Sequence, residues 1–399
     1  MQRDLRIGFV SIHDATDIHA WSGIPAHVLA SLRKMDVQVE LFSPLSQRSK
    51  YLLAPIKAIA RMRNTNISLD HYPLVMESYA RQIKRAMRER PVDVIVSTSS
   101  IPIAMLKCPQ PILYWTDAVF HGMYDYYQGA FAGVTPGGIR RAKRQEEAAL
   151  NNCSVAAYAS EWAASTARSL TDPKKVCVLP FGASFDVEHK ASDVAQWATR
   201  KRRERARACE LLFIGVEWHR KGGAVAVETA RILNGRGIPT TLTIVGCDPP
   251  GPVPEYVRAM GFISKSTMEG RQRMESLLRD SDLFILPTLA EAAGIVFCEA
   301  SAFGLPSLSY ATGGVPDYVR DGVNGVCLPV GTPAEGFAKA AQEILQDAGR
   351  YEALCLSAFD EYANRLNWDS SVRRLVDLCR SAVLNKLQLS SPDASMEDR

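Results

Sequence analysis

Short apolar runs of strand length alternate with longer segments of helical periodicity along the chain. In the first half the apolar runs lie at residues 5–12, 37–42, 92–97, 111–115, 154–159 and 175–179, with helix-type segments at 25–34, 73–90, 138–150 and 161–170. A strand covered on both faces is a continuous apolar run, whereas a half-exposed strand alternates. The pattern therefore predicts βαβ units around a parallel, doubly wound sheet.

The same rhythm starts again after a strongly basic stretch at residues 200–205, with new apolar runs at 211–216, 241–245, 282–286, 307–310 and 325–328. This restart predicts a second α/β domain. An i, i+3, i+4, i+7 apolar stripe then predicts a final helix. We expect domains at 1–183 and 184–368, a helix at 369–387 that crosses back to the first domain, and a frayed tail at 388–399.

Composition places the chain among globular proteins and gives its first half a basic character. Of its 399 residues 47% are hydrophobic and 23% charged, which excludes a disordered, collagenous or membrane-spanning chain. Residues 1–200 hold 24 basic and 18 acidic side chains, a net charge of +6, and the rest hold 23 and 25, a net charge of −2. No apolar leader precedes the first run, so we expect a cytoplasmic protein.

The richest chemistry follows the apolar run 282–286. Ligands of open parallel sheets bind outside the carboxyl ends of the strands. Glu291 lies in the loop there, and Glu299 lies in the predicted helix; both can accept hydrogen bonds from vicinal hydroxyls of a sugar or ribose. Gly294 lets a ligand approach, and an anion is expected at the amides of Ala293, Gly294, Ile295 and Val296. The alternative interpretation is that Glu291 is an ordinary surface residue of the loop and that Glu299 is a solvated residue of the helix.

A second loop, after the run 211–216, carries Arg220 and Lys221. At the start of a helix, two cations and the helix dipole suit a diphosphate. The alternative interpretation is a pair of solvated charges.

The first domain offers two further candidates. Gly23 lies in a loop that opens a helix and presents amides to a phosphate, or forms only a turn. Asp117 follows the run 111–115 and is placed for a catalytic or acceptor-binding carboxylate, although capping a helix is the commoner role. The histidines lack metal-binding spacing, so we expect no metal.

A basic helical face formed by Arg81, Lys84, Arg85 and Arg88 suits peripheral association with an anionic membrane surface. A solvated charged face is the alternative. Nucleic acid is not expected as a partner, because no aromatic stacking pattern accompanies the charge. The glycine-rich dinucleotide and P-loop signatures are missing.

The spacing of Glu291 and Glu299, followed by Gly304-x-Pro306, Gly313-Gly314-x-Pro316 and Asp321-Gly322-x-Asn324-Gly325, resembles the signature of glycosyltransferase family 4. The similarity spans most of residues 154–380, and the N-terminal third agrees only in outline. The resemblance implies a GT-B fold, in which two Rossmann-like domains face a central cleft.

It also implies transfer of a hexose-type sugar, with retention of configuration, from a nucleotide diphosphate sugar. The acceptor is expected to be a hydroxyl of a sugar, a lipid-linked glycan or a small molecule, with no metal and no cofactor. The first domain would bind the acceptor and the second the donor. The alternatives are a non-catalytic nucleotide-sugar-binding protein and a GT-B epimerase or hydrolase.

Carried over by residue, the resemblance assigns Glu299 to the donor ribose, Glu291 to a sugar hydroxyl, Lys221 to the diphosphate and the backbone near Ile263 to the base. The amides of residues 293–296 would contact sugar and phosphate. Two positions depart from the family. Val216 stands where an arginine is usual, and Arg220 is the expected substitute. Thr116 stands where a histidine is usual, which leaves Asp117, or else His121, as the catalytic group beside Glu291 and Lys221.

Overall fold

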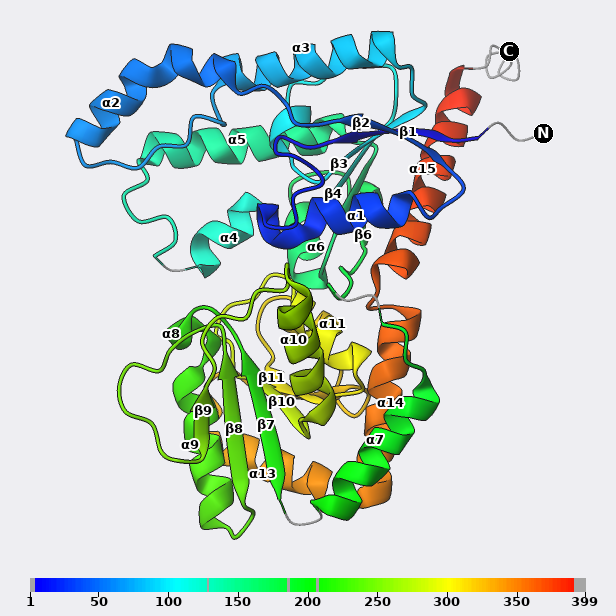
Figure 1. The fold of residues 1–399 in the computed structure, drawn as a ribbon. Helices are drawn as coiled ribbons and strands as arrows, with labels where there is room; N and C mark the ends of the chain where they lie inside the picture. The colour runs from blue at the N-terminus through cyan, green and yellow to red at the C-terminus, as the bar shows by residue number, and fades with distance from the viewer. Residues whose placement is uncertain (1–3, 128, 185–186, 206–207, 391–399) are drawn as a thin grey trace. The chain divides into compact units, whose positions relative to one another are not determined.

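The computed structural model describes residues 4–127, 129–184, 187–205 and 208–390, and the chain divides into two compact units (Figure 1). Unit 1 comprises Met1–Leu179 and Ser371–Arg399, and unit 2 comprises Pro180–Ser370. The sequence placed this division after residue 183. Of the predicted tail, residues 391–399 lie outside the described residues, and 388–390 belong to the last helix.

Unit 1 is built on a parallel sheet of six strands in the order β2-β1-β3-β4-β5-β6. The strands are β1 (Arg6–Val10), β2 (Gln38–Phe42), β3 (Val94–Ser97), β4 (Ile112–Thr116), β5 (Val155–Tyr158) and β6 (Val176–Val178). Every residue of β3 and β4 is buried, so each shows the continuous apolar run expected of a strand covered on both faces. The predicted doubly wound α/β unit is confirmed.

The helices of unit 1 are α1 (Ile24–Leu32), α2 (Ala54–Met62), α3 (Pro73–Glu89), α4 (Phe120–Tyr126), α5 (Pro136–Asn152) and α6 (Glu161–Arg168). Short 3₁₀ segments are η1 (Ala20–Gly23), η2 (Arg48–Leu53), η3 (Ile101–Ile103) and η4 (Pro173–Lys175). α1, α2, α3 and α5 each begin with a proline in the first turn, where the missing N–H costs nothing.

Unit 2 repeats the plan with a sheet that reads β9-β8-β7-β10-β11-β12, again with all strands parallel. Its strands are β7 (Cys209–Ile214), β8 (Thr240–Val245), β9 (Val257–Ala259), β10 (Leu283–Leu286), β11 (Ser307–Tyr310) and β12 (Gly325–Leu328). This is the Rossmann strand order, whose ligand crevice lies between β7 and β10, where the direction of winding reverses.

The helices of unit 2 are α7 (Ala191–Glu204), α8 (Trp218–Lys221), α9 (Gly223–Gly235), α10 (Met268–Asp280), α11 (Ile295–Ala302), α12 (Val315–Tyr318), α13 (Ala334–Leu345) and α14 (Ala348–Asn364). α9 packs on β7, β8 and β10, and α13 packs on β11 and β12. The helices thus close the sheet of unit 2 over a core of buried aliphatic and aromatic side chains.

The basic stretch at residues 200–205, after which the apolar rhythm restarts, lies at the end of helix α7 and is part of the core packing of unit 2. Lys201 and Arg202 are buried there. The Lys201 ammonium donates to the Ser281 carbonyl oxygen at 2.7 Å, and the Arg202 guanidinium pairs with the buried Asp282 carboxylate at 2.6 Å.

The last helix, α15 (Trp368–Ser390), starts in unit 2 and belongs to unit 1 from Ser371 onward. The predicted apolar stripe packs as expected at Val372, Leu375, Val376 and Cys379, which are all buried. No helix in the described ranges is both long and apolar enough to cross a membrane.

Candidate functional site

Three loops meet at the carboxyl edge of the unit 2 sheet, following β7, β10 and β11. The Leu289 amide donates to the Arg220 carbonyl at 2.8 Å, and the Gly314 amide donates to the Glu291 carbonyl at 2.8 Å. The Thr312 hydroxyl donates to the Leu289 carbonyl at 3.1 Å. Hydrogen bonds therefore join motifs that are far apart in the sequence at the point between β7 and β10 where the direction of winding reverses.

Lys221 and Glu291 are brought into direct contact at this edge. The Lys221 ammonium hydrogen-bonds and ion-pairs with the Glu291 carboxylate. Their side chains are only 11% and 13% exposed, so the pair lies within the loops rather than on the open surface. The interpretation of Glu291 as an ordinary loop surface residue is therefore wrong.

Arg220 and Lys221 form the last turn of the short helix α8 and directly precede Gly222, the N-cap of α9, so they lie at the start of a helix as predicted. The Arg220 guanidinium donates to both carboxylate oxygens of Glu217, at 2.6 and 3.0 Å, and to the Ala290 carbonyl at 2.7 Å. The hydrogen bond from Arg220 lowers the pKa of Glu217. Arg220 therefore ties the loop after β7 to the loop after β10.

Gly222 follows this pair and caps the start of α9 in a left-handed conformation with φ +78°. A Cβ atom there would lie 2.1 Å from the carbonyl oxygen of Pro287. Only glycine allows the loop after β7 to pass this closely beside the end of β10. That close passage brings Lys221 to Glu291.

The predicted helix start at Gly294 is confirmed, because Gly294 is the N-cap of α11. In the described part of the chain the amides of Ala293, Gly294 and Ile295 donate no hydrogen bond, as expected for the unsatisfied first turn of a helix. The glycine was predicted to admit a ligand. The structure adds a packing reason, since a Cβ there would lie 2.3 Å from the Phe297 ring.

Glu299, five residues into α11, is 1% exposed, so its interpretation as a solvated helix residue is wrong. Its Oε1 accepts from the Lys265 ammonium at 2.5 Å. Its Oε2 is buried and accepts no hydrogen bond from any residue the structure describes. A buried carboxylate oxygen without a donor is costly to folding, and such atoms in a native protein point to a ligand or catalytic role.

Lys265 is a site residue that the sequence analysis missed. It lies in the loop between β9 and α10, and the Arg271 side chain donates to its carbonyl oxygen at 2.7 Å. The preceding loop residue Ile263, predicted beside the base, is buried in the core of unit 2. Lys265 lies several residues beyond β9, a strand that the sequence pattern did not predict, so no sequence signal singled it out.

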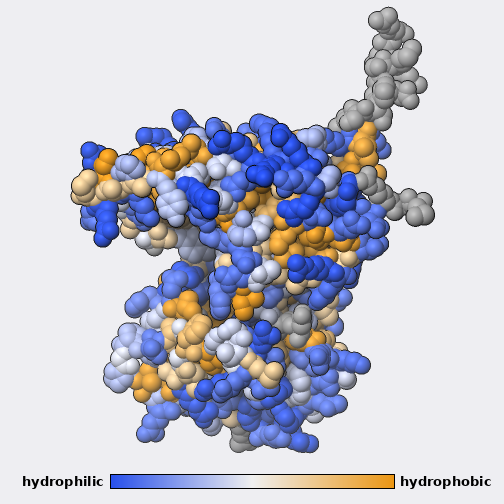
Figure 2. All heavy atoms as spheres, turned by 45° about the horizontal axis from the view of Figure 1, so that its top comes forward, coloured by the Kyte–Doolittle hydropathy of each residue, from blue (hydrophilic) through white to orange (hydrophobic). Residues whose placement is uncertain are grey.

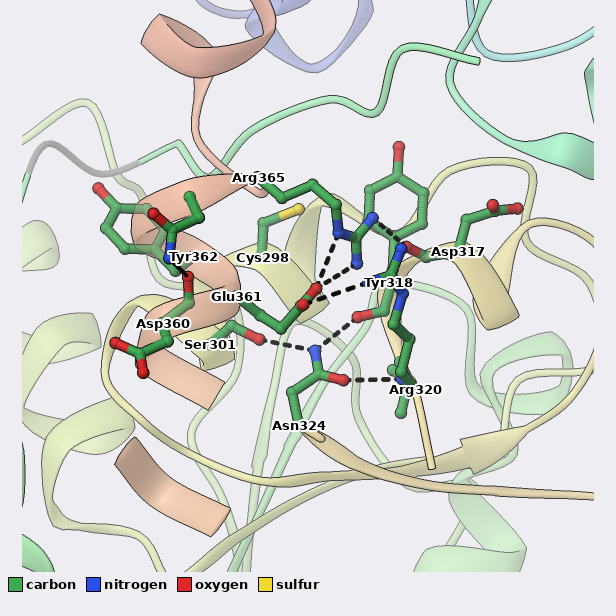
Figure 3. A network of polar contacts seen from close by, with 12 residues as sticks. Cys298, Ser301, Asp317, Tyr318, Arg320, Asn324, Asp360, Glu361, Tyr362 and Arg365 are labelled. Atoms are coloured by element: carbon green, nitrogen blue, oxygen red, sulfur yellow. Dashed lines mark hydrogen bonds and ion pairs between the residues drawn. The ribbon is translucent and has the colours of Figure 1, made fainter. Parts of the chain in front are cut away.

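Behind α11, a polar network holds the loops in place (Figure 3). The buried Asn324 side-chain amide donates to the Ser301 hydroxyl at 3.1 Å and to the Tyr318 carbonyl at 2.7 Å. Glu361 of α14 pairs with Arg365, which donates to the Asp317 carbonyl at 2.6 Å. Asn324 of the Asp-Gly-x-Asn-Gly motif therefore links α11 to α12, and Arg365 links α12 to the end of α14.

In unit 1, Asp117 directly follows β4, as predicted. The N-cap of the next helix, α4, is Val119, two residues after Asp117. His121 lies on α4, and its Nε2 is 3.1 Å from a carboxylate oxygen of Glu147. Asp117 therefore stands at the carboxyl edge of the sheet with His121 near it in sequence.

Gly23 is the N-cap of α1, with φ +75°. The two residues before it, Trp21 and Ser22, also have positive φ, at 47° and 56°. Three successive left-handed residues are rare, and such strain concentrates at functional sites. The loop belongs to the β1 end of the sheet, next to β3, where the strand order of unit 1 reverses.

A buried carboxylate in unit 1 was also missed. Glu146 of α5 accepts from the Ser100 hydroxyl at 2.9 Å and from the Tyr114 hydroxyl at 3.1 Å. Burial raises its pKa to about 7. Its spacing from the apolar Ala142 and Ala149 places it on the inner face of the helix, which the sequence pattern could have indicated.

Among the described side chains, no group of three or more His, Cys, Asp or Glu residues is placed to hold a metal ion. Metal independence stays a prediction.

The family model covers part of unit 2. The family model described as glycosyl transferases group 1 matches residues 208–347. A D-inositol 3-phosphate glycosyltransferase of Rhodococcus jostii is 27% identical over 225 residues, which is 54% of this chain and 49% of the relative. One of Salinispora tropica is 36% identical over 110 residues, 28% of this chain and 22% of the relative. The matches thus span half or less of these relatives.

Solved structures match nearly the whole chain. Sucrose-phosphate synthase of Thermosynechococcus elongatus has a TM-score of 0.66 at 15% identity, covering 96% of this chain and 100% of that one. Anabaena HepE in complex with UDP-glucose has a TM-score of 0.60 at 16% identity, covering 94% and 100%. At these identities the similarity shows the fold. The chain therefore has the fold of GT-B glycosyltransferases, and its residues 208–347 match the family of glycosyl transferases group 1.

Proposed function

We propose that this protein is a retaining glycosyltransferase that moves a hexose-type sugar from a nucleotide diphosphate sugar to a hydroxyl acceptor. The observation that carries the proposal is the buried Glu299 carboxylate with an unpartnered oxygen. It lies at the same sheet edge as the Lys221–Glu291 pair and as the amides at the start of α11 that donate no hydrogen bond in the described chain. A ribose, a diphosphate and a sugar present the hydroxyls and negative charge that these groups would bind.

In this proposal Glu299 accepts hydrogen bonds from the ribose hydroxyls, and Lys221 and the α11 amides hold the diphosphate. Glu291, held by Lys221, accepts from a sugar hydroxyl. The bond between the anomeric carbon and the diphosphate oxygen breaks, and its electron pair leaves with the phosphate. Cations and oriented N–H groups stabilise that developing charge. The acceptor oxygen bonds the anomeric carbon on the same face, and its proton passes to the departing phosphate.

The choice of donor base, donor sugar and acceptor is guided only by the names of similar proteins. HepE was solved with UDP-glucose, and the matched relatives are named for D-inositol 3-phosphate. We therefore propose UDP-glucose as the first donor to test, and sugars, lipid-linked glycans and a phosphorylated polyol as acceptors. Asp117 is proposed to orient the acceptor hydroxyl, without a metal ion or cofactor.

Calorimetric titration with UDP, ADP and GDP tests the binding part. Glu299→Ala should weaken the preferred nucleotide by about tenfold or more, because a hydrogen bond to a charged group is worth roughly 1.5–3 kcal/mol. Glu228→Ala, at a surface ion pair of α9, should leave affinity unchanged. Equal affinity in Glu299→Ala and wild type would remove the donor assignment.

Turnover of the bound donor with and without acceptors tests the reaction. Transfer that requires an acceptor supports the proposal, and Asp117→Asn should then lower turnover while leaving nucleotide affinity unchanged. Donor consumption without acceptor would indicate an epimerase or hydrolase. Binding without turnover across the panel would indicate a non-catalytic binding protein.

A further inference from the structure

Residues 48–63 of unit 1, which comprise η2, α2 and Arg63, are mostly exposed. Ala60 is the buried residue of α2, and Leu53 that of η2. Five large apolar side chains of this segment are exposed, namely Tyr51 (78%), Leu52 (70%), Ile56 (38%), Ile59 (46%) and Met62 (79%). So dense a group of exposed apolar side chains on one short segment indicates an interaction surface.

The apolar side chains of this segment share one face. Leu52, Ile56 and Ile59 follow the i, i+4, i+7 spacing of a helical stripe. Lys57 and Arg61, four residues apart, lie together on the opposite, polar face of α2. In Figure 2 apolar surface gathers at the end of unit 1 where Figure 1 places α2, with hydrophilic surface beside it.

The charge on this segment has one sign. No acidic residue occurs between Glu40 and Asp70. The Lys50 ammonium forms an ion pair with the Asp70 carboxylate at 2.7 Å. The other basic side chains of the segment form no ion pair with any residue that the structure describes, and they are Arg48, Lys57, Arg61 and Arg63. An apolar stripe, with cations on the polar face of the same helix and at both ends of the segment, matches a surface that is apolar inside and anionic outside.

The basic face of α3 that the sequence singled out lacks this combination. Arg81, Arg85 and Arg88 are exposed, but α3 carries no large exposed apolar side chain in the structure. Arg85 is also paired with Glu89 at 3.0 Å. The α3 face fits the solvated interpretation.

We propose that residues 48–63 dock unit 1 on a lipid bilayer that contains anionic lipid. The apolar stripe enters the boundary between headgroups and acyl chains, and the four cations lie at the lipid phosphates. Self-association would bring two such cationic segments together, so charge favours lipid over a second copy of the chain. The inference does not rest on the proposed glycosyl transfer, because its test measures binding to membranes.

The full chain is tested by flotation with vesicles of phosphatidylcholine alone or with about 30% phosphatidylglycerol. Wild type should bind the anionic vesicles, bind neutral vesicles at least about tenfold more weakly, and be released by salt. The double variants Leu52→Ser/Met62→Ser and Lys57→Gln/Arg61→Gln should each weaken binding by about tenfold. All four positions are exposed, and thermal melting followed by circular dichroism verifies folding.

Two matched controls locate the surface. Met268→Ser/Val330→Ser removes exposed apolar side chains of unit 2, and Arg85→Gln/Arg88→Gln removes charge from α3. Both should bind within about twofold of wild type. The proposal is overturned if wild type ignores anionic vesicles, if neither 48–63 variant weakens binding, or if the α3 variant weakens it equally. Self-association that Leu52→Ser/Met62→Ser abolishes, without vesicle binding, would also overturn it.

Discussion

Lys265 and Glu299 are 34 residues apart in sequence, and the Lys265 ammonium lies 2.5 Å from one oxygen of the Glu299 carboxylate. The other oxygen is buried and accepts no hydrogen bond from the described chain. One cation therefore holds the carboxylate while leaving its second oxygen open. Lys265 is a positioning residue in this arrangement.

Replacing Lys265 with Gln should weaken nucleoside diphosphate binding by roughly 5- to 30-fold, because Glu299 loses the charge that orients it. Lys265→Arg retains a cation and should recover most of the affinity. Calorimetric titration measures both, with Lys174→Gln on η4 as the surface control. Equal losses in Gln and Arg variants would contradict a positioning role through charge.

Gly222→Ala should lower the free energy of unfolding by about 3 kcal/mol or more, as a left-handed alanine is strained and its Cβ would meet the Pro287 carbonyl. Gly237→Ala is a matched control, because Gly237 has nearly the same φ, 76°, but nothing within 4 Å of the added Cβ. It should cost only about 1–2 kcal/mol. Urea denaturation compares them, and similar losses would show that the contact with Pro287 is unimportant.

The sheets were predictable because their central strands are covered on both faces. The run 111–115 nearly coincides with β4, in which all residues are buried. The edge strand β9 (Val257–Ala259) was not predicted, since only Val257 is buried and the other residues are exposed. A strand without a continuous apolar run leaves no such signal.

The sequence predicted those site residues that lie close together in one motif. It did not predict contacts that the tertiary structure forms between residues far apart in the sequence. Glu291, Gly294 and Glu299 lie in one motif and were identified together. The contact between Lys265 and Glu299 depends on how two separate crossovers pack, which spacing does not encode. Likewise the composition of residues 200–205 could not show that Arg202 is buried against Asp282.

That buried pair should be important for the stability of unit 2. The Arg202 and Asp282 side chains are 5% and 0% exposed, and Asp282 also accepts from the Glu210 amide at 2.8 Å. Asp282→Ala leaves a buried cation uncompensated and should cost about 3–5 kcal/mol of unfolding free energy. Arg200→Gln, which breaks the exposed pair with Asp280, should cost about 0–1 kcal/mol. Chemical denaturation would contradict this if both variants lost the same amount.

Glu146 should make unit 1 less stable as the pH rises. Burial raises its pKa from 4.5 to about 7, so the folded protein keeps a proton that the unfolded chain has released. Stability from this group is present below pH 4.5 and is lost as the pH rises through about 7, with a total of about 3 kcal/mol.

Glu146→Gln keeps an oxygen that can accept a hydrogen bond from Ser100 or Tyr114 and cannot ionise. Its unfolding free energy relative to wild type should rise by about 2–3 kcal/mol between pH 5 and pH 8, measured by urea denaturation. Glu77→Gln, at an exposed position of α3, should show no such rise. A difference for Glu146→Gln that does not change with pH would mean that the buried carboxyl is ionised throughout this range.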